Sequence, residues 1–110
     1  MKILMNEVEH SILKEYDRAS EEYGPVHNSD HEAYAVLLEE FEEALDDVRY
    51  CEKEIEEFWK LVKDKTAPDD IKVCRLKTIY AQALYGACEL IQTAAMAHKA
   101  IRTIEERGKC

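Results

Sequence analysis

Residues 29–48 read SDHEAYAVLLEEFEEALDDV, and this stretch decides the fold because its apolar residues recur every three or four positions. Ser29 and Glu32 form a capping-box pattern at its start. In that pattern the Ser29 hydroxyl accepts a hydrogen bond from the backbone N–H of Glu32, and the Glu32 side chain reaches back to the N–H of Ser29. The apolar stripe then continues without a helix breaker and consists of Tyr34, Leu37, Phe41, Ala44, Val48, Cys51, Ile55, Phe58 and Val62. The sequence therefore predicts one amphipathic helix over residues 30–65, for which a local bend near Tyr50 stays open.

The same periodicity predicts one helix before this stretch and one after it. The first carries a stripe of Met5, Val8, Ile12, Tyr16, Ala19 and Tyr23. It ends at Gly24-Pro25, because proline lacks a backbone donor and restricts the residue before it. The third begins at Pro68, ends at Arg107-Gly108, and carries a stripe of Leu76, Tyr80, Ala83, Ala87, Leu90, Ala94, Ala97, Ile101 and Ile104.

These patterns predict an all-α protein, an antiparallel helical bundle with one shorter and two long helices in a single domain of residues 1–110. Three helices of such unequal length do not bury all of their apolar stripes against one another. A homodimer that completes a four-helix or larger bundle removes this mismatch, and we therefore expect a homodimer or a higher homo-oligomer. The third helix also has small residues that let a partner helix approach closely, namely Gly86, Ala87, Ala94, Ala95 and Ala97.

Composition narrows the classes of partner. The chain has a formal net charge of −9, so it lacks the clustered lysines and arginines with which proteins bind nucleic acid directly. It has no run of 18 apolar residues and no signal-peptide pattern, which indicates a cytoplasmic protein that does not span a membrane.

The four cysteines are too widely spaced for a zinc site, since none of them forms a CxxC pair. Cys51, Cys74 and Cys88 fall within helical patterns, where we expect buried or half-buried reduced thiols. Cys110 at the terminus is expected to be exposed.

The acidic residues of residues 37–48 allow two interpretations. Glu39, Glu40 and Glu43 lie three or four positions apart, so their like charges repel one another on a helix. One interpretation is a solvated acidic face, which is what most charge runs are. The other is a site for Mg²⁺, a cation that prefers oxygen ligands and often shares its shell with phosphates.

Three segments together resemble a known family. They are EExxE at residues 39–43 with its approach HEAYAVLLEE at residues 31–40, and ELIQTAAMA at residues 89–97 on the third helix. The combination resembles the MazG-like all-α nucleoside triphosphate pyrophosphohydrolases, particularly small phage and prophage members. The resemblance covers about residues 26–46 and 86–102.

The resemblance implies a MazG-like helical domain that assembles as dimers or tetramers. It also implies a reaction in which Mg²⁺ grips a triphosphate and an activated water attacks the α-phosphate, giving a nucleoside monophosphate and pyrophosphate. The implied metal ligands are Glu39, Glu40, Glu43 and Glu89, of which Glu40 and Glu43 are also the implied catalytic residues. The implied substrate-binding residues are His31, Gln92 and Lys99, although the favoured interpretation of Lys99 is a solvated side chain. Gln92 stands where the family's ExxD motif has its aspartate, which removes one charge from the site.

Three functions stay open from the sequence. The first is an Mg²⁺-dependent nucleotide pyrophosphohydrolase. The second is a catalytically weak or inactive protein of phage origin that binds and sequesters a nucleotide, a reading that Gln92 motivates. The third is a non-enzymatic, acidic helical interaction protein.

Overall fold

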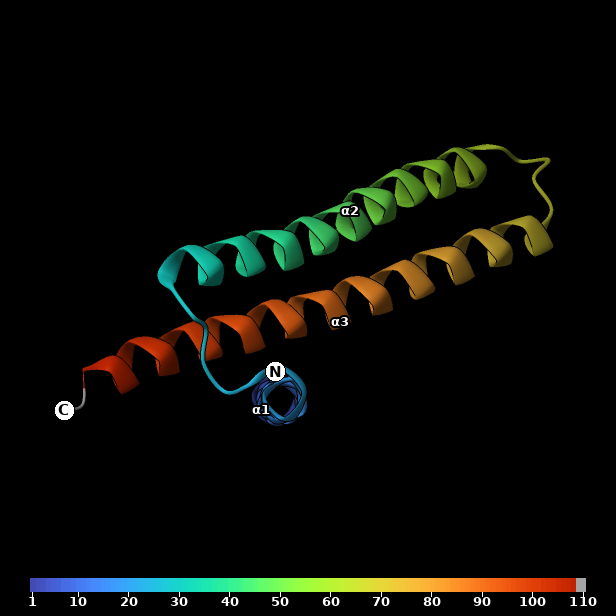
Figure 1. The fold of residues 1–110 in the computed structure, drawn as a ribbon. Helices are drawn as coiled ribbons and strands as arrows, with labels where there is room; N and C mark the ends of the chain where they lie inside the picture. The colour runs from blue at the N-terminus through green and yellow to red at the C-terminus, as the bar shows by residue number, and fades with distance from the viewer. Residues whose placement is uncertain (109–110) are drawn as a thin grey trace. The chain divides into compact units, whose positions relative to one another are not determined.

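The computed structural model describes residues 1–108 and contains three α-helices, which are α1 (Lys2–Tyr23), α2 (Asp30–Lys63) and α3 (Asp69–Arg107) (Figure 1). No strand occurs among these residues, so the all-α prediction is confirmed. The helix α2 is continuous over 34 residues, and all three helices end within a few residues of their predicted limits. The prediction for Cys110 lies outside the described residues.

Local chemistry fixes the ends of α1 and α2. Gly24 closes α1 with a φ of 92°, a conformation that side chains disfavour, and its N–H donates to the Ser20 carbonyl at 2.9 Å. At the start of α2 the Glu32 N–H donates to Ser29 Oγ at 3.1 Å, which confirms half of the capping box. The other half is wrong. The Glu32 carboxylate accepts instead from the Asn28 backbone N–H at 3.4 Å and from Asn28 Nδ2 at 2.9 Å, because Asn28 offers two donors in place of one.

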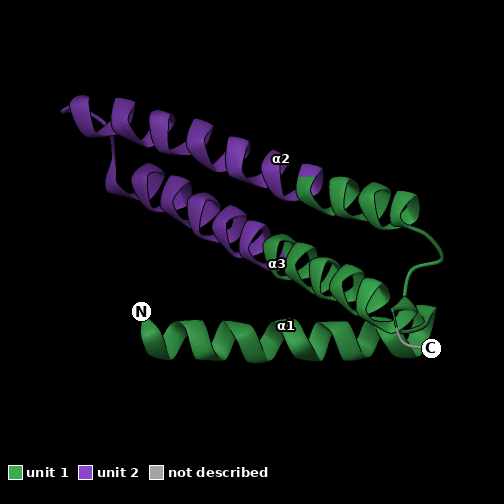
Figure 2. Ribbon diagram, turned by 90° about the vertical axis from the view of Figure 1, so that its left-hand side faces the viewer, with its two compact units in different colours: residues 1–41, 89–110 green, residues 42–88 purple. Residues whose placement is uncertain are grey.

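The chain divides into two compact units, each of which takes part of α2 and part of α3 (Figure 2). Unit 1 comprises residues 1–41 and 89–108, that is, α1, the first turns of α2 and the last turns of α3. Unit 2 comprises residues 42–88, that is, the rest of α2, a short connection and the start of α3.

In unit 1 the start of α2 is tied to the end of α3. Arg107 donates to both carboxylate oxygens of Asp30 at 2.8 and 2.9 Å, so the two helices run antiparallel. The helix α1 packs against α3 through an edge-to-face contact of the Tyr16 and His98 rings, whose centroids lie 4.6 Å apart. The buried apolar side chains of this unit are Ala19, Ala33 and Ala95.

In unit 2, α2 and α3 form an antiparallel hairpin. Polar side chains lie along its seam, the line where the two helices meet. Arg75 of α3 donates to Glu54 of α2 at 2.6 Å, and Cys51 Sγ lies 4.0 Å from the Ile79 carbonyl. A methyl group on Gly86 would lie 3.5 Å from Cβ of Asp47, which is ordinary van der Waals contact. Ala44 is the one buried apolar side chain within residues 42–88.

The apolar stripes have the predicted helical period, but most of their residues are exposed and do not form a core. On α2 the half formed by Ala44, Cys51 and Phe58 is buried or half-buried, whereas Tyr34, Phe41, Val48, Ile55 and Val62 are 46–67% exposed. On α3 most of the predicted stripe is exposed as well, at Leu76, Tyr80, Ala83, Ala87, Leu90, Ile101 and Ile104. The reason is that α2 carries two neighbouring apolar rows, and the contact with α3 uses only one of them.

Two of the predicted buried thiols are exposed. Cys51 is half-buried as expected, but Cys74 and Cys88 lie at exposed positions of α3. Helical periodicity predicts that Cys74 and Cys88 lie on a helix, but it does not predict which face of that helix packs against another helix.

No helix in the described part of the chain holds an apolar segment long enough to cross a bilayer.

Candidate functional site

Unit 1 encloses a cavity of about 560 Å³, which is within the range of small-molecule sites. Its walls come from α1, from the connection after Gly24, and from the unit 1 parts of α2 and α3. Ala19, Tyr23, Val36 and Met96 supply apolar wall, and the remaining lining side chains are polar or charged. The cavity therefore combines an apolar surface with a small set of polar groups.

At one side of the cavity, Gln92 lies between two glutamates. Glu40 and Glu89 each offer a carboxylate oxygen, and these oxygens lie within 4.8 Å of each other. With its amide nitrogen turned toward them, Gln92 donates to Glu40 Oε2 at 3.1 Å and to Glu89 Oε2 at 3.2 Å. One neutral amide thus offsets part of the repulsion between two carboxylates from different helices. Of the three residues, Glu40 and Gln92 line the cavity.

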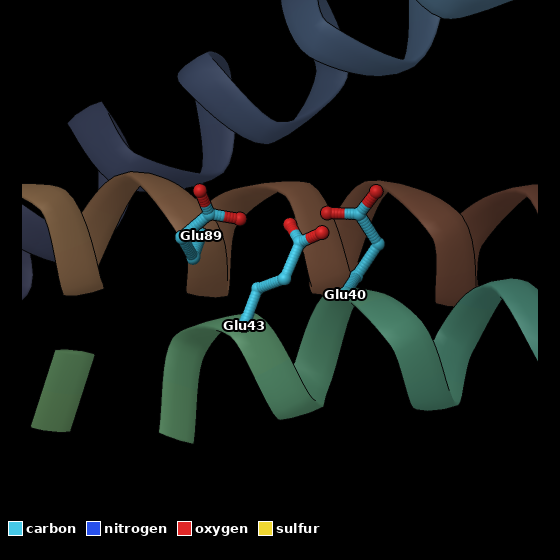
Figure 3. Close-up of side chains that lie close together, drawn as sticks. All are labelled: Glu40, Glu43 and Glu89. Carbon is cyan, nitrogen blue, oxygen red and sulfur yellow. The ribbon is translucent and has the colours of Figure 1, made fainter. Parts of the chain in front are cut away.

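The other two glutamates of the EExxE pattern are both exposed. Glu43 is exposed, lies one turn after Glu40 on the same helix, and belongs to unit 2; Figure 3 shows its side chain together with those of Glu40 and Glu89. Glu39 is exposed and is not among the carboxylates that converge in the described residues. The helical spacing thus separates Glu40, which faces α3, from Glu39, which faces solvent.

Lys99 is buried in the cavity wall, with 6% of its surface exposed, so its interpretation as a solvated residue is wrong. The reason is that α1 packs over this part of α3, as the contact between Tyr16 and His98 shows. No described carboxylate lies within ion-pair distance of the Lys99 ammonium. Its ammonium group is not among the buried unpartnered nitrogens of the described residues, and Lys99 lines the cavity, where a positive charge suits an anionic ligand.

His27 is held beside Lys99 by two hydrogen bonds. The His27 backbone N–H donates to Thr103 Oγ1 at 2.9 Å, and the Thr103 hydroxyl donates to the Lys99 carbonyl at 2.7 Å. The His27 side chain is 1% exposed, and neither ring nitrogen makes a hydrogen bond within the described residues. Its Nδ1 lies 3.6 Å from Glu32 Oε1, an ion pair only when the ring is protonated.

The other charged groups of the cavity wall are already paired. Hydrogen bonds from Arg18 lower the pKa of Glu15, and the pKa of Arg18 is raised in turn by Glu15 and Glu22. Hydrogen bonds from Asn28 lower the pKa of Glu32. These carboxylates therefore stay ionised near neutral pH and are occupied within the chain. Among the described residues that line the cavity, Lys99 is then the cation without a carboxylate partner.

The sequence identified some of these residues and missed others. Glu40, Gln92 and Lys99 line the cavity of unit 1, and Glu89 lies beside Glu40 and Gln92. His31 is exposed on the first turn of α2 and does not line the cavity. The residues missed by the sequence include Arg18 and His27, which line the cavity without any spacing that indicates it.

Mg²⁺ is commonly held by one or two carboxylates together with waters and phosphate oxygens, and Glu40 with Glu89 supplies two neighbouring carboxylates. The Gln92 amide nitrogen is not a ligand, so a cation at this position requires the amide to turn and present its oxygen. No protein-family model, curated protein or solved structure matches this chain.

Proposed function

We propose that the chain is an Mg²⁺-dependent nucleotide pyrophosphohydrolase, which cleaves a nucleoside triphosphate or a related nucleotide to the monophosphate and pyrophosphate. One observation carries the proposal: Glu40 lines the cavity and also lies beside Glu89 of another helix. A ligand in the cavity can therefore reach the carboxylates.

The cavity suits a nucleotide in size and polarity. A nucleoside can contact its apolar wall, formed in part by Tyr23 and Met96, while the phosphates extend toward Glu40. Lys99 provides an unpaired positive charge for those phosphates. The substrate-binding role of His31 is not part of this proposal, because His31 is exposed.

The acidic residues have distinct tasks in this proposal. Glu40 and Glu89 hold the cation, and the family resemblance implies Glu43 as a further ligand. When bound, Mg²⁺ supplies charge neutralisation on the phosphates and a more acidic water as nucleophile. Glu39 remains a predicted ligand whose exposed position does not favour it.

A second function is favoured by Gln92. With its amide nitrogen turned toward them, Gln92 donates to both carboxylates and bridges them without a cation. A protein of this kind can bind a nucleotide through the cavity and sequester it without cleaving it, as a phage-derived protein would.

We further propose that the protein acts as a homodimer or higher homo-oligomer in the cytoplasm. The exposed apolar rows on α2 and α3 support the assembly, because a single chain leaves them uncovered. The same rows suffice for an interaction protein without enzymatic activity, which is the third function that the sequence left open.

Pyrophosphate release from a panel of nucleotides, with Mg²⁺ or with EDTA, tests the proposed activity. We expect release that requires Mg²⁺ and is lost in Glu40→Gln, because the cavity-lining carboxylate is removed. Glu42→Gln, on an exposed neighbour of the same helix, is the matched control and should retain activity. Absence of release from every nucleotide at high protein concentration would reject the hydrolase.

Thermal shift with the same panel separates hydrolysis from sequestration. A nucleotide at 100 times its dissociation constant stabilises the folded protein by about 2.7 kcal/mol. Stabilisation without turnover supports the sequestering protein, and Lys99→Met should then reduce it. Indifference to every nucleotide and to Mg²⁺ counts against both functions and favours the interaction protein.

A further inference from the structure

One buried side chain of the cavity wall has no task in the proposed reaction. His27 lines the cavity of unit 1, and its side chain is 1% exposed. The described residues hold three buried side-chain nitrogen or oxygen atoms without a hydrogen-bond partner, and two of them are the ring nitrogens of His27. Burying a polar group costs free energy unless a hydrogen bond compensates it. The ring is therefore suited to a partner that arrives with a ligand.

The main chain holds His27 in place without satisfying its ring. The His27 backbone N–H donates to Thr103 Oγ1 at 2.9 Å, so the connection between α1 and α2 is fastened to α3 at this residue. The ring nitrogens make no hydrogen bond within the described residues. A residue whose backbone is fixed and whose side chain is unsatisfied is preorganised for a ligand, because little conformational freedom is lost on binding.

A neighbouring carboxylate decides which ring nitrogen carries the proton. Glu32 Oε1 lies 3.6 Å from Nδ1 of His27. Hydrogen bonds from Asn28 keep the pKa of Glu32 low, so its carboxylate is ionised near neutral pH. A neutral imidazole carries one proton, and a negative charge beside Nδ1 favours that proton on Nδ1. Nε2 is then left with a lone pair, so it accepts a hydrogen bond and does not donate one.

His27 lies at the opposite end of the cavity from the carboxylate that would hold the cation. At one end Gln92, with its amide nitrogen turned toward Glu40, donates to that carboxylate at 3.1 Å. At the other end Glu32 lies beside His27. Glu32 and Glu40 are eight residues apart on α2, which is about 12 Å along the helix axis, and Val36 lines the cavity halfway between them. The cavity therefore has two polar ends and an apolar middle, with a length comparable to that of a nucleoside monophosphate.

We propose that His27 is a specificity-determining residue, whose Nε2 accepts a hydrogen bond from an N–H group of the ligand's nucleobase. The inference rests on the proposed function, in which Glu40 and its cation hold the phosphates. The base of the same nucleotide then extends past the apolar middle of the cavity to His27. Because Nε2 is covered in the free chain, the ring turns slightly about its side-chain bonds to meet the base. A ligand that presents only acceptors there leaves both lone pairs without a donor.

Calorimetric binding of nucleotide pairs that differ only in the N–H groups of the base tests the proposal. The probes are uridine and adenosine triphosphates with a methylene bridge between the α- and β-phosphates, which blocks cleavage. Each is paired with a counterpart whose base is methylated at its N–H groups. We expect the wild type to bind at least one unmethylated nucleotide about 10-fold more tightly than its counterpart. In His27→Phe this ratio should fall to about one, because the acceptor is removed.

Two further variants separate recognition of the base from packing of the cavity wall. His27→Gln offers an amide oxygen as acceptor and should restore part of the ratio. His10→Phe changes a histidine that is exposed on α1 and does not line the cavity, so this matched control should keep the wild-type ratio. A ratio that persists in His27→Phe overturns the proposal. So does selectivity that follows the sugar hydroxyls, measured with dideoxy analogues, and not the base.

A second measurement needs neither a nucleotide nor a folded variant. Heteronuclear NMR of the ring nitrogens in the free wild-type protein, in mildly alkaline solution, reports the tautomer of each neutral histidine. We expect the buried ring of His27 to carry its proton on Nδ1. A proton on Nε2 overturns the proposal even when nucleotides bind. If no nucleotide binds, the proposed function fails and the base is not the partner, whereas the tautomer alone decides whether His27 is an acceptor.

Discussion

Unit 1 and unit 2 share two helices but use them in opposite ways. In unit 1, buried positions include the polar and charged side chains of His27, Lys99 and Thr103, and the first two of these line a cavity. In unit 2 a polar seam with the Glu54–Arg75 pair lies inside, and a broad apolar face lies outside.

The difference shows that the same helical period favours ligand binding where a third helix covers the hairpin and assembly where no helix covers it. Covering part of α3 with α1 buries polar groups that a bare hairpin would leave in water, and buried polar groups without partners favour ligands. The bare hairpin instead exposes its apolar row, which favours assembly. Each of the following substitutions tests one side of this comparison.

The largest effect is expected in the packed interior of unit 1. Ala95 is fully buried, so Ala95→Leu forces side chains and helices apart and should destabilise the protein by about 1–3 kcal/mol. Urea unfolding followed by circular dichroism measures the change. Ala35→Leu, at an exposed position of α2 in the same unit, should change stability by less than about 0.5 kcal/mol. Equal effects at both positions would show that unit 1 is not packed around Ala95.

A smaller loss is expected from the buried hydroxyl of unit 1. Thr103→Val removes the acceptor of the His27 N–H and should cost about 1–2 kcal/mol in the free energy of unfolding. Thr78 of unit 2 donates only to the Cys74 carbonyl one turn back, so Thr78→Val leaves no donor unpaired and should be nearly neutral. If Thr78→Val lowers the free energy of unfolding as much as Thr103→Val does, the proposed difference between the two units is contradicted.

Unit 2 should gain stability from a change at its seam. Gly86→Ala adds a methyl group at ordinary contact distance from Asp47 and removes a glycine from the interior of α3. We expect a stabilisation of about 0.5–1 kcal/mol, from helix propensity, in the same urea measurement. A loss of stability would mean that the seam is tighter than the contact at Asp47 indicates.

The smallest effect concerns pH and the exposed ion pair of unit 1. Arg107 lowers the pKa of Asp30 below its ordinary value of 3.8, so at a pH between the folded and unfolded pKa values the unfolded chain binds a proton that the folded chain does not. The stabilisation is present above pH 3.8 and is lost as the pH falls through the lower value of the folded state. We expect Asp30→Asn to reduce the fall in Tm between pH 7 and pH 3. Asp46→Asn, at an exposed position of unit 2, is the control and should leave that fall unchanged.

Much of the fold could be predicted from the sequence because its signals are local. Gly24-Pro25 and Ser29 mark helix ends through backbone conformation and hydrogen bonding, and the structure places both as predicted. The failure at Glu32 shows the limit, since Asn28, just outside the helix, outcompeted the expected partner.

The site was predictable only where residues share a helix. Glu40 and Glu43 are three apart, and so are Glu89 and Gln92, which fixes each pair on one face. The proximity of Glu40 to Glu89, and the donation from Gln92 to both, depend on the register between α2 and α3. His27 and Arg18 join the cavity through α1 and its connection, and no spacing in the sequence announces them.

The sequence by itself determined three amphipathic helices, their ends, and an acidic protein with a carboxylate cluster on its longest uninterrupted stripe. Only the tertiary structure decided which row of each stripe meets a neighbour, because 3.6 residues per turn fixes a period and not a partner. It turned Tyr34, Phe41 and Ile55 outward and buried Lys99 within unit 1. The physical reason is that burial depends on which helix lies beside a face, which is a contact between residues far apart in the chain.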